Sequence, residues 1–267
     1  MPRFLIHPGF HKTGTSSLQR TMEQNAEALA DRVRVITKDE ASTLRRAAQL
    51  YAQAGDDEAL ELLTESIAAL LAKIDPSETR DVVLSEEDLC GLIPWRHGKT
   101  GYEDAPTILK HMCVGVATHF PEHDVQVLLT LRQTAPWAKS CYSQHLRSTD
   151  IQLSLEEYLQ TAAARCDLSA QAKHIRAAIA PIPVEVAWLE DLRSTPLGPA
   201  TAALARLPQA LWMLDQLTPC PPANTTLPEA LAAEFLRLNQ SGLDNWDLKS
   251  AKKQARQKYW RAQRDPS

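Results

Sequence analysis

The sequence predicts an α/β protein: a three-layer fold whose parallel sheet is flanked by helices, followed by a helical C-terminal part. Short apolar runs alternate with longer stretches of helical periodicity, which is the pattern of strands joined by crossover helices. Residues 125–131 are apolar almost without interruption, as expected for a central strand covered on both faces. We expect the 267 residues to form one domain, residues 1–267.

The expected elements alternate along the chain. Apolar runs predict strands at residues 4–6, 33–37, 81–85, 125–131 and 182–187. Apolar residues three or four apart predict helices at about 18–29, 40–54, 60–74, 105–119, from 135 onward, 154–165, 168–180, 199–206, 208–216, 228–240 and 247–263. Residues 91–101 are expected to be a loop. The Pro-rich stretch 218–228 is expected to be a surface loop, with a hinge as the alternative.

The composition narrows the class of protein. Hydrophobic residues make up 44% and charged residues 23% of the chain, which is typical of a globular protein. The net charge of −4 argues against a general nucleic-acid or membrane-surface binder, so neither partner is expected and any basic site is local. The five cysteines are far apart, which favours reduced, mostly buried thiols. Without a signal peptide or a membrane-spanning run, a cytoplasmic location is expected.

The stretch at residues 7–19, HPGFHKTGTSSLQ, follows the first expected strand and begins the first expected helix. Gly9 and Gly14 can take positive φ and let the backbone approach a ligand closely. The first helical turn, whose amides and dipole favour an anion, carries three hydroxyl residues, Thr15, Ser16 and Ser17. Lys12 adds a mobile positive charge. The stretch predicts an anion-binding loop, although a turn of this kind that binds nothing is the alternative for the loop alone.

Arg132 follows the expected strand 125–131 and lies eight residues before Ser140. An Arg at a strand end and a hydroxyl about two turns into the next helix can hold one phosphate together, because Arg binds phosphate in a bidentate manner. Taken alone, such an Arg is more often a surface or ion-pair residue. Since ligands of open parallel sheets bind beyond the carboxyl ends of the strands, we expect Arg132 near the anion-binding loop.

These segments resemble a known family. Residues 12–18, KTGTSSL, do not form a Walker A loop, in which Lys follows the second Gly. They resemble the 5′-phosphosulfate loop of the sulfotransferases, with His11 where Pro is common. The Arg-x7-Ser spacing from Arg132 to Ser140 resembles the 3′-phosphate motif of that family. Residues 186–193, VAWLEDLR, are similar to a family segment ending in Tyr-Glu-Asp-Leu, with Leu189 in place of Tyr.

The resemblance implies a P-loop NTPase-like sulfotransferase fold and an enzyme that uses 3′-phosphoadenosine 5′-phosphosulfate (PAPS) as co-substrate, without a metal. The acceptor would be a hydroxyl or amine, on a carbohydrate or a small metabolite. The implied donor-binding residues are Lys12, Thr13, Gly14, Thr15, Ser16, Ser17, Arg132 and Ser140. Lys12 would also stabilise the leaving 3′,5′-diphosphate. An ATP-dependent P-loop kinase and a non-catalytic anion-binding protein of the same fold are the alternatives.

An acceptor also needs a base, and three residues are candidates. Glu86 is the first choice because it follows the expected strand 81–85 at the same edge of the sheet. Glu87 could take the role instead. His11 is the third candidate, since imidazole titrates near neutral pH. The alternative for the acidic pair is helix capping, with Ser85 at the N-cap and the carboxylates in the first turn.

The C-terminal segment 249–264 is rich in Lys and Arg. Such a run is usually a solvated helix face, which is the expectation here. Contact with the donor and binding of an anionic acceptor are the alternatives.

Overall fold

The computed structural model describes residues 1–221 and 226–264, so residues 222–225 of the Pro-rich stretch lie outside the described residues. The chain divides into two compact units. The first holds residues 1–133 and 166–224, and the second holds residues 134–165 and 225–267. This division into units does not test the single domain expected from the sequence, which stays a prediction. Among the described helices, none combines the length and the apolar composition needed to cross a membrane.

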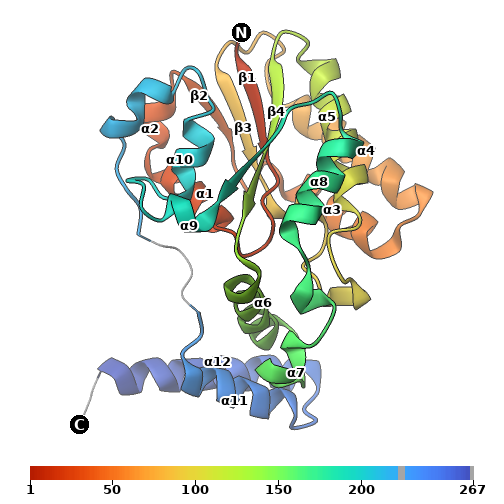
Figure 1. Cartoon of the computed structure of the whole chain (residues 1–267), viewed down its shortest axis with the longest axis vertical. Helices are drawn as coiled ribbons and strands as arrows, with labels where there is room; N and C mark the ends of the chain where they lie inside the picture. Colours follow the sequence, from red (N-terminus) through yellow and green to blue (C-terminus); the bar gives the residue numbers. More distant parts are fainter. Residues whose placement is uncertain (222–225, 265–267) are drawn as a thin grey trace. The chain divides into compact units, whose positions relative to one another are not determined.

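The first unit contains a five-stranded sheet in the order β2-β3-β1-β4-β5, and every neighbouring pair is parallel (Figure 1). Its strands are β1 (Arg3–His7), β2 (Val33–Ile36), β3 (Asp81–Ser85), β4 (Asp124–Leu131) and β5 (Val184–Trp188). Each begins and ends within about two residues of the expected range, which is the usual uncertainty of element ends. The predicted parallel α/β architecture is therefore confirmed.

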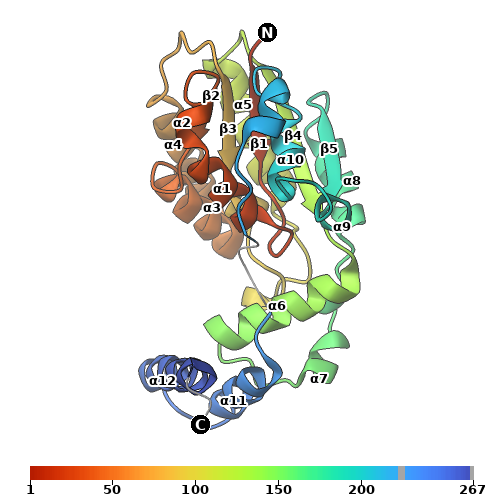
Figure 2. The ribbon, with the colours of Figure 1, turned by 90° about the vertical axis from the view of Figure 1, so that its left-hand side faces the viewer.

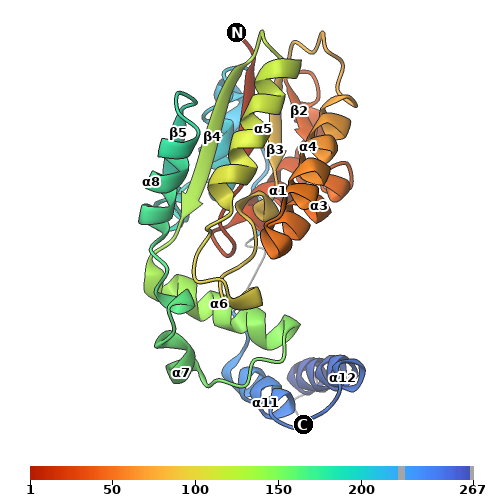
Figure 3. The same cartoon turned by 90° about the vertical axis from the view of Figure 1, so that its right-hand side faces the viewer.

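Helices cover both faces of this sheet (Figures 2 and 3). One face carries α1 (Thr15–Gln24), α2 (Ala26–Leu29), α9 (Leu189–Leu192), α10 (Pro199–Leu204) and the 3₁₀ helix η4 (Leu211–Gln216). The other carries α3 (Ser42–Ala54), α4 (Asp57–Leu71), α5 (Ala105–His119) and α8 (Leu168–Ala178). The 3₁₀ helices η1 (Glu87–Cys90) and η2 (Arg96–Gly98) follow β3 in the chain. Residues 211–216 thus form a 3₁₀ helix where the sequence predicts an ordinary helix.

The hydrophobic core fixes the position of α1 on the sheet. Leu5, Val83 and Leu128 come from three neighbouring strands and pack in one cluster with Leu18 and Met22 of α1. Side chains alternate along a strand, so the residues between them face the helices on the opposite side. Because α1 is held by its buried face, the loop that precedes it is held at the carboxyl end of β1.

The central strand β1 is the point where the strand order reverses. The chain passes from β1 to β2 and β3 on one side of it, and then to β4 and β5 on the other. In open α/β sheets, ligands bind beyond the carboxyl ends of the strands at such a switch point. The topology therefore places the loop after β1 at the edge where a ligand is expected.

The second unit is helical. It consists of α6 (Thr134–Ser148), α7 (Leu155–Leu159), the 3₁₀ helix η3 (Ala163–Arg165), α11 (Glu229–Asn239) and α12 (Asn245–Arg264). Helix α6 contacts α7, η3 and α11, and α11 lies beside α12. The helix expected at 154–165 is divided in two, because the Thr161 hydroxyl accepts the amide hydrogen of Ala164 at 3.2 Å and begins a new turn.

The thiols agree with the expectation from the sequence. All five cysteines are free, and Cys90, Cys113, Cys141 and Cys166 are buried. Burial raises the pKa of Cys113 to about 12, so this thiol stays protonated and unreactive near neutral pH.

Candidate functional site

The β1–α1 loop, residues 8–14, presents the uncapped start of α1. Lys12 has a φ of 68° and Gly14 a φ of 106°, both left-handed. Gly14 is the N-cap residue; it makes no side-chain cap, and the first turn of α1 contains no acidic residue. The amides of Thr15 and Ser16 have no carbonyl one turn earlier in the helix. The positive end of the helix dipole is thus not neutralised within α1 and favours an anion.

The hydroxyl of Thr15 adds a second feature of an anion site. Its Oγ1 is buried and has no hydrogen-bond partner among the described residues. A buried polar atom without a partner costs about 1–3 kcal/mol, so it is expected to serve a purpose. Gly9 lies against it, and a Cβ at position 9 would stand 2.4 Å from this oxygen. The close packing of Gly9 therefore requires the absence of a side chain there.

A buried hydrogen-bond network around His7 holds the loop on the ends of the strands. His7 Nδ1 lies 2.8 Å from Ser85 Oγ, and His7 Nε2 lies 3.2 Å from Thr130 Oγ1. Thr130 Oγ1 lies 2.8 Å from Thr13 Oγ1, and the Thr13 hydroxyl donates to the Phe10 carbonyl at 2.6 Å. Burial lowers the pKa of His7 to about 3, so the ring is neutral, with one nitrogen donating and the other accepting. The network joins the loop to β1, β3 and β4.

This network also shows what Thr13 does. The sequence places Thr13 among the donor-binding residues, but its side chain is fully buried in the network. Thr13 therefore supports the loop through its hydroxyl. His7 begins the stretch 7–19, but nothing in the sequence indicates its supporting role or that of Thr130, because their contacts are made across the sheet.

Arg132 lies where the sequence predicts it, directly after β4. Its Nη1 donates a hydrogen bond to the Lys12 carbonyl at 3.2 Å. The loop thus has a guanidinium beside it in addition to the ammonium of Lys12. Ser140, the other residue of the Arg-x7-Ser spacing, lies in α6 of the second unit, and its part in binding stays a prediction.

Glu86, directly after β3, caps the 3₁₀ helix η1 and carries a buried carboxyl group with a raised pKa. It is only 3% exposed, and its amide donates to the His7 carbonyl at 3.1 Å. Its Oε1 accepts the amide hydrogen of Asp88 at 3.3 Å, while Oε2 is buried without a hydrogen-bond partner among the described residues. Arg45 Nη1 lies 3.9 Å from Oε2. Burial, followed by the charge of Asp88, raises the pKa of Glu86 to about 7.

The capping alternative is thus corrected in one respect. The cap of η1 is Glu86 itself, not Ser85, because the Ser85 hydroxyl is held by His7. Glu87 lies in η1 and is half-buried.

His11 is held in place by an acidic and an aromatic neighbour. Its Nε2 lies 3.5 Å from Asp88 Oδ1, and its ring stacks on Tyr102 with an interplanar angle of 12°. The His11 amide donates to the Tyr102 hydroxyl at 3.1 Å. Burial raises the pKa of Asp88. The hydrogen bond and the charge of His11, with smaller effects of Gln49 and Arg45, lower this pKa by more, so it lies below its usual value. A carboxylate in this position orients the imidazole ring.

Sequence reasoning missed three residues of this cluster: Arg45, Asp88 and Tyr102. Asp88 had a signal, because it lies in the same acidic turn as Glu86. Arg45 and Tyr102 had none, since both approach the site only through the packing of α3 and of the segment before α5.

Comparisons of the chain with protein-family models, with curated proteins and with solved structures find no match. The site is therefore assigned from its chemistry and geometry. In the described part of the chain, no group of three or more His, Cys, Asp or Glu side chains is arranged to hold a metal ion.

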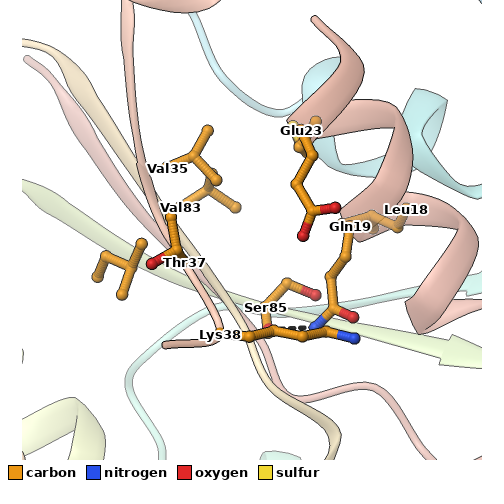
Figure 4. Close-up of a pocket in the computed structure, with 10 residues that line it drawn as sticks. Leu18, Gln19, Glu23, Val35, Thr37, Lys38, Val83 and Ser85 are labelled. Carbon is orange, nitrogen blue, oxygen red and sulfur yellow. Dashed lines mark hydrogen bonds between the residues drawn. The ribbon is translucent and has the colours of Figure 1, made fainter. Parts of the chain in front are cut away.

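A small pocket lies between α1 and the strands β2 and β3 (Figure 4). Leu18 and Val83 contribute apolar lining, and Glu23 and Lys38 contribute charged groups. Gln19 Nε2 donates to the Ser85 carbonyl at 2.6 Å, which joins α1 to the end of β3. Ser85 belongs to both the pocket lining and the His7 network.

Proposed function

We propose that this chain is a PAPS-dependent sulfotransferase that transfers a sulfuryl group to a hydroxyl or amine of a small metabolite or carbohydrate. The observation that carries the proposal is the β1–α1 loop. It combines an uncapped helix start, the buried hydroxyl of Thr15, which has no hydrogen-bond partner in the described part of the chain, and Arg132 beside Lys12. These groups fit an anion with several oxygens, and their order in the sequence resembles the 5′-phosphosulfate loop.

The loop residues would bind and orient the donor. The amides of the first turn of α1 and the Thr15 hydroxyl would donate hydrogen bonds to the 5′-phosphosulfate. Arg132 would bind a phosphate of the donor, and by the resemblance Ser140 would join it at the 3′-phosphate. Thr13 and His7 would hold the loop in this conformation.

Sulfuryl transfer would require stabilisation of the negative charge on the leaving group and one proton transfer from the acceptor. The bond from the acceptor oxygen or nitrogen to sulfur forms as the bond from sulfur to the bridging oxygen breaks. The electron pair of that bond leaves with the 3′,5′-diphosphate, whose added charge Lys12 would stabilise. The proton of the acceptor passes to a base of the protein.

Two residues are our candidates for the base that accepts this proton. Glu86 is the first, because a carboxyl group with a pKa of about 7 can accept a proton near neutral pH and its Oε2 makes no hydrogen bond within the described residues. His11 is the second, because Asp88 lies 3.5 Å from its Nε2 and orients its ring.

An ATP-dependent kinase and a non-catalytic anion-binding protein remain the alternatives. Lys12 precedes Gly14 by two positions, which disfavours the Walker loop of a kinase. The buried groups Glu86, Asp88 and His11 favour a catalyst over a simple anion-binding protein, because perturbed carboxylates cluster at active sites.

Calorimetric titration with adenosine 3′,5′-diphosphate, beside ATP with Mg²⁺, tests the proposal. We expect the diphosphate to bind more tightly than ATP, and Thr15→Val to weaken it about tenfold or more, as for a lost hydrogen bond to a charged group. Thr21→Val is the matched control, because the Thr21 hydroxyl bonds to the Ser17 carbonyl within α1. Preference for ATP would indicate a kinase, and no binding of either nucleotide would refute the donor site.

A further inference from the structure

Helix α12 concentrates positive charge in a chain that is acidic overall. Its only acidic residue is Asp247, and its seven basic residues are Lys249, Lys252, Lys253, Arg256, Lys258, Arg261 and Arg264. The whole chain has a net charge of −4. The expectation of no membrane partner rested on that total, which does not describe the local charge of α12.

One side of α12 is anchored within the second unit. Leu248 and Lys252 are buried, and α11 lies alongside. Lys252 Nζ donates to the Thr149 carbonyl at 2.7 Å and lies 5.8 Å from the ring centre of Phe235. Lys252 is therefore a structural cation, and these contacts determine which side of the helix faces solvent.

The exposed side carries tryptophan among cations. At 3.6 residues per turn, six exposed residues fall within a sector of about 80°. This surface, the Trp-Lys stripe, consists of Trp246, Lys249, Lys253, Arg256, Trp260 and Arg264. Trp246 is 82% exposed and Trp260 46% exposed. Asp247 lies outside the sector. Two large aromatic side chains left in water beside four cations distinguish this surface from an ordinary charged helix face.

We propose that the Trp-Lys stripe binds the surface of an anionic phospholipid membrane. Lys and Arg near an anionic surface are attracted to it, and Trp is enriched at the membrane–water interface. Because α12 already packs its buried side within the protein, it would lie on the headgroups without inserting. The two tryptophans are 14 positions apart, about 21 Å along the axis. They can touch a plane at two points, but they are too far apart to stack on successive bases of a nucleic acid.

Flotation of the full chain with vesicles tests this proposal, using phosphatidylcholine alone and phosphatidylcholine with phosphatidylserine. We expect binding only with phosphatidylserine, and its loss at high salt. Lys249→Gln with Lys253→Gln should weaken binding about tenfold or more. Lys258→Gln with Arg261→Gln removes the same charge outside the sector and should retain most of it. Trp246→Ala with Trp260→Ala should also weaken binding. All six residues are exposed, and thermal unfolding of each variant checks that the fold is kept.

Several results would overturn the proposal. No binding to phosphatidylserine vesicles would do so, as would equal loss in the two charge variants, because attraction would then not depend on the stripe. Preference for a single-stranded oligonucleotide would indicate a nucleic-acid surface. A dimer that dissociates in the tryptophan variant, measured by light scattering, would show that a second copy covers the stripe. None of these results bears on the nucleotide titration, so the two proposals fail separately.

Discussion

Arg132 donates a hydrogen bond from Nη1 to the carbonyl oxygen of Lys12 across 3.2 Å, although 120 positions separate the two residues in the chain. The bond joins the end of β4 to the loop after β1, where Lys12 has a left-handed φ of 68°. One guanidinium therefore supports the loop conformation and adds positive charge beside it. Binding and loop geometry are expected to depend on the same residue.

Arg132→Ala should weaken adenosine 3′,5′-diphosphate binding by about 2 kcal/mol or more, because it removes both a charged phosphate contact and the bond to Lys12. Arg132→Lys should recover only part of the loss, since Lys lacks the planar fork. Titration calorimetry measures both. Arg193→Ala, at an exposed position, controls for the loss of one positive charge. Equal affinities of the Arg132→Ala and Arg193→Ala variants would contradict the assignment.

Gly9→Ala should destabilise the protein and weaken diphosphate binding. A left-handed backbone costs a non-glycine residue about 1 kcal/mol. The new Cβ would also stand 2.4 Å from Thr15 Oγ1 and 2.9 Å from His7 Cε1, which adds about 1–3 kcal/mol. Gly55→Ala is the matched control, because its φ of 68° is similar to the 53° of Gly9 and no atom of the described residues lies within 4 Å of the added Cβ. Urea unfolding should therefore show the larger loss for Gly9→Ala; similar losses would mean that the packing at Gly9 is loose.

Glu86 should make stability depend on pH. Its pKa is raised from 4.5 to about 7, so the protonated carboxyl is favoured in the folded state. This stabilisation is fully present below pH 4.5 and is lost as the pH rises through 7, amounting to about 3 kcal/mol at about 1.4 kcal/mol per pKa unit. Glu86→Gln keeps an oxygen for the Asp88 amide and should remove this dependence. Unfolding free energies across the range measure the difference.

Activity should change with pH in the opposite direction, because a base must be deprotonated. Sulfuryl transfer should rise through pH 7 and be almost abolished in Glu86→Gln. Glu87→Gln, the same change at the half-buried neighbour, is the control. If Glu86→Gln remained active while His11→Gln did not, the base would be His11.

His11 and Asp88 should be energetically coupled. Their side chains lie 3.5 Å apart and both are largely buried, so each single substitution leaves a partner without its contact. A double-mutant cycle with His11→Gln and Asp88→Asn should give a coupling free energy of about 1–3 kcal/mol in unfolding experiments. Additive losses would show that the two side chains do not interact.

The described fold follows the sequence closely where local patterns decide structure. The strand 81–85 and the helix 105–119 have the expected bounds, because a continuous apolar run and a regular helical period are each complete within the segment. The sequence was less informative at residues 208–216 and 154–165, where the chain forms 3₁₀ turns that depend on individual side-chain bonds such as that of Thr161.

The sequence by itself determined the parallel α/β architecture, the place of the loop before α1 and the position of Arg132 at a strand end. Local periodicity and turn residues are enough for these, since parallel strands bring their carboxyl ends to one edge. Only the tertiary structure decided that Thr13 supports the loop, that Glu86 caps η1 and that Asp88 and Tyr102 hold His11. Those relations depend on burial and on contacts between distant segments, and a buried carboxylate acquires its pKa only from what surrounds it.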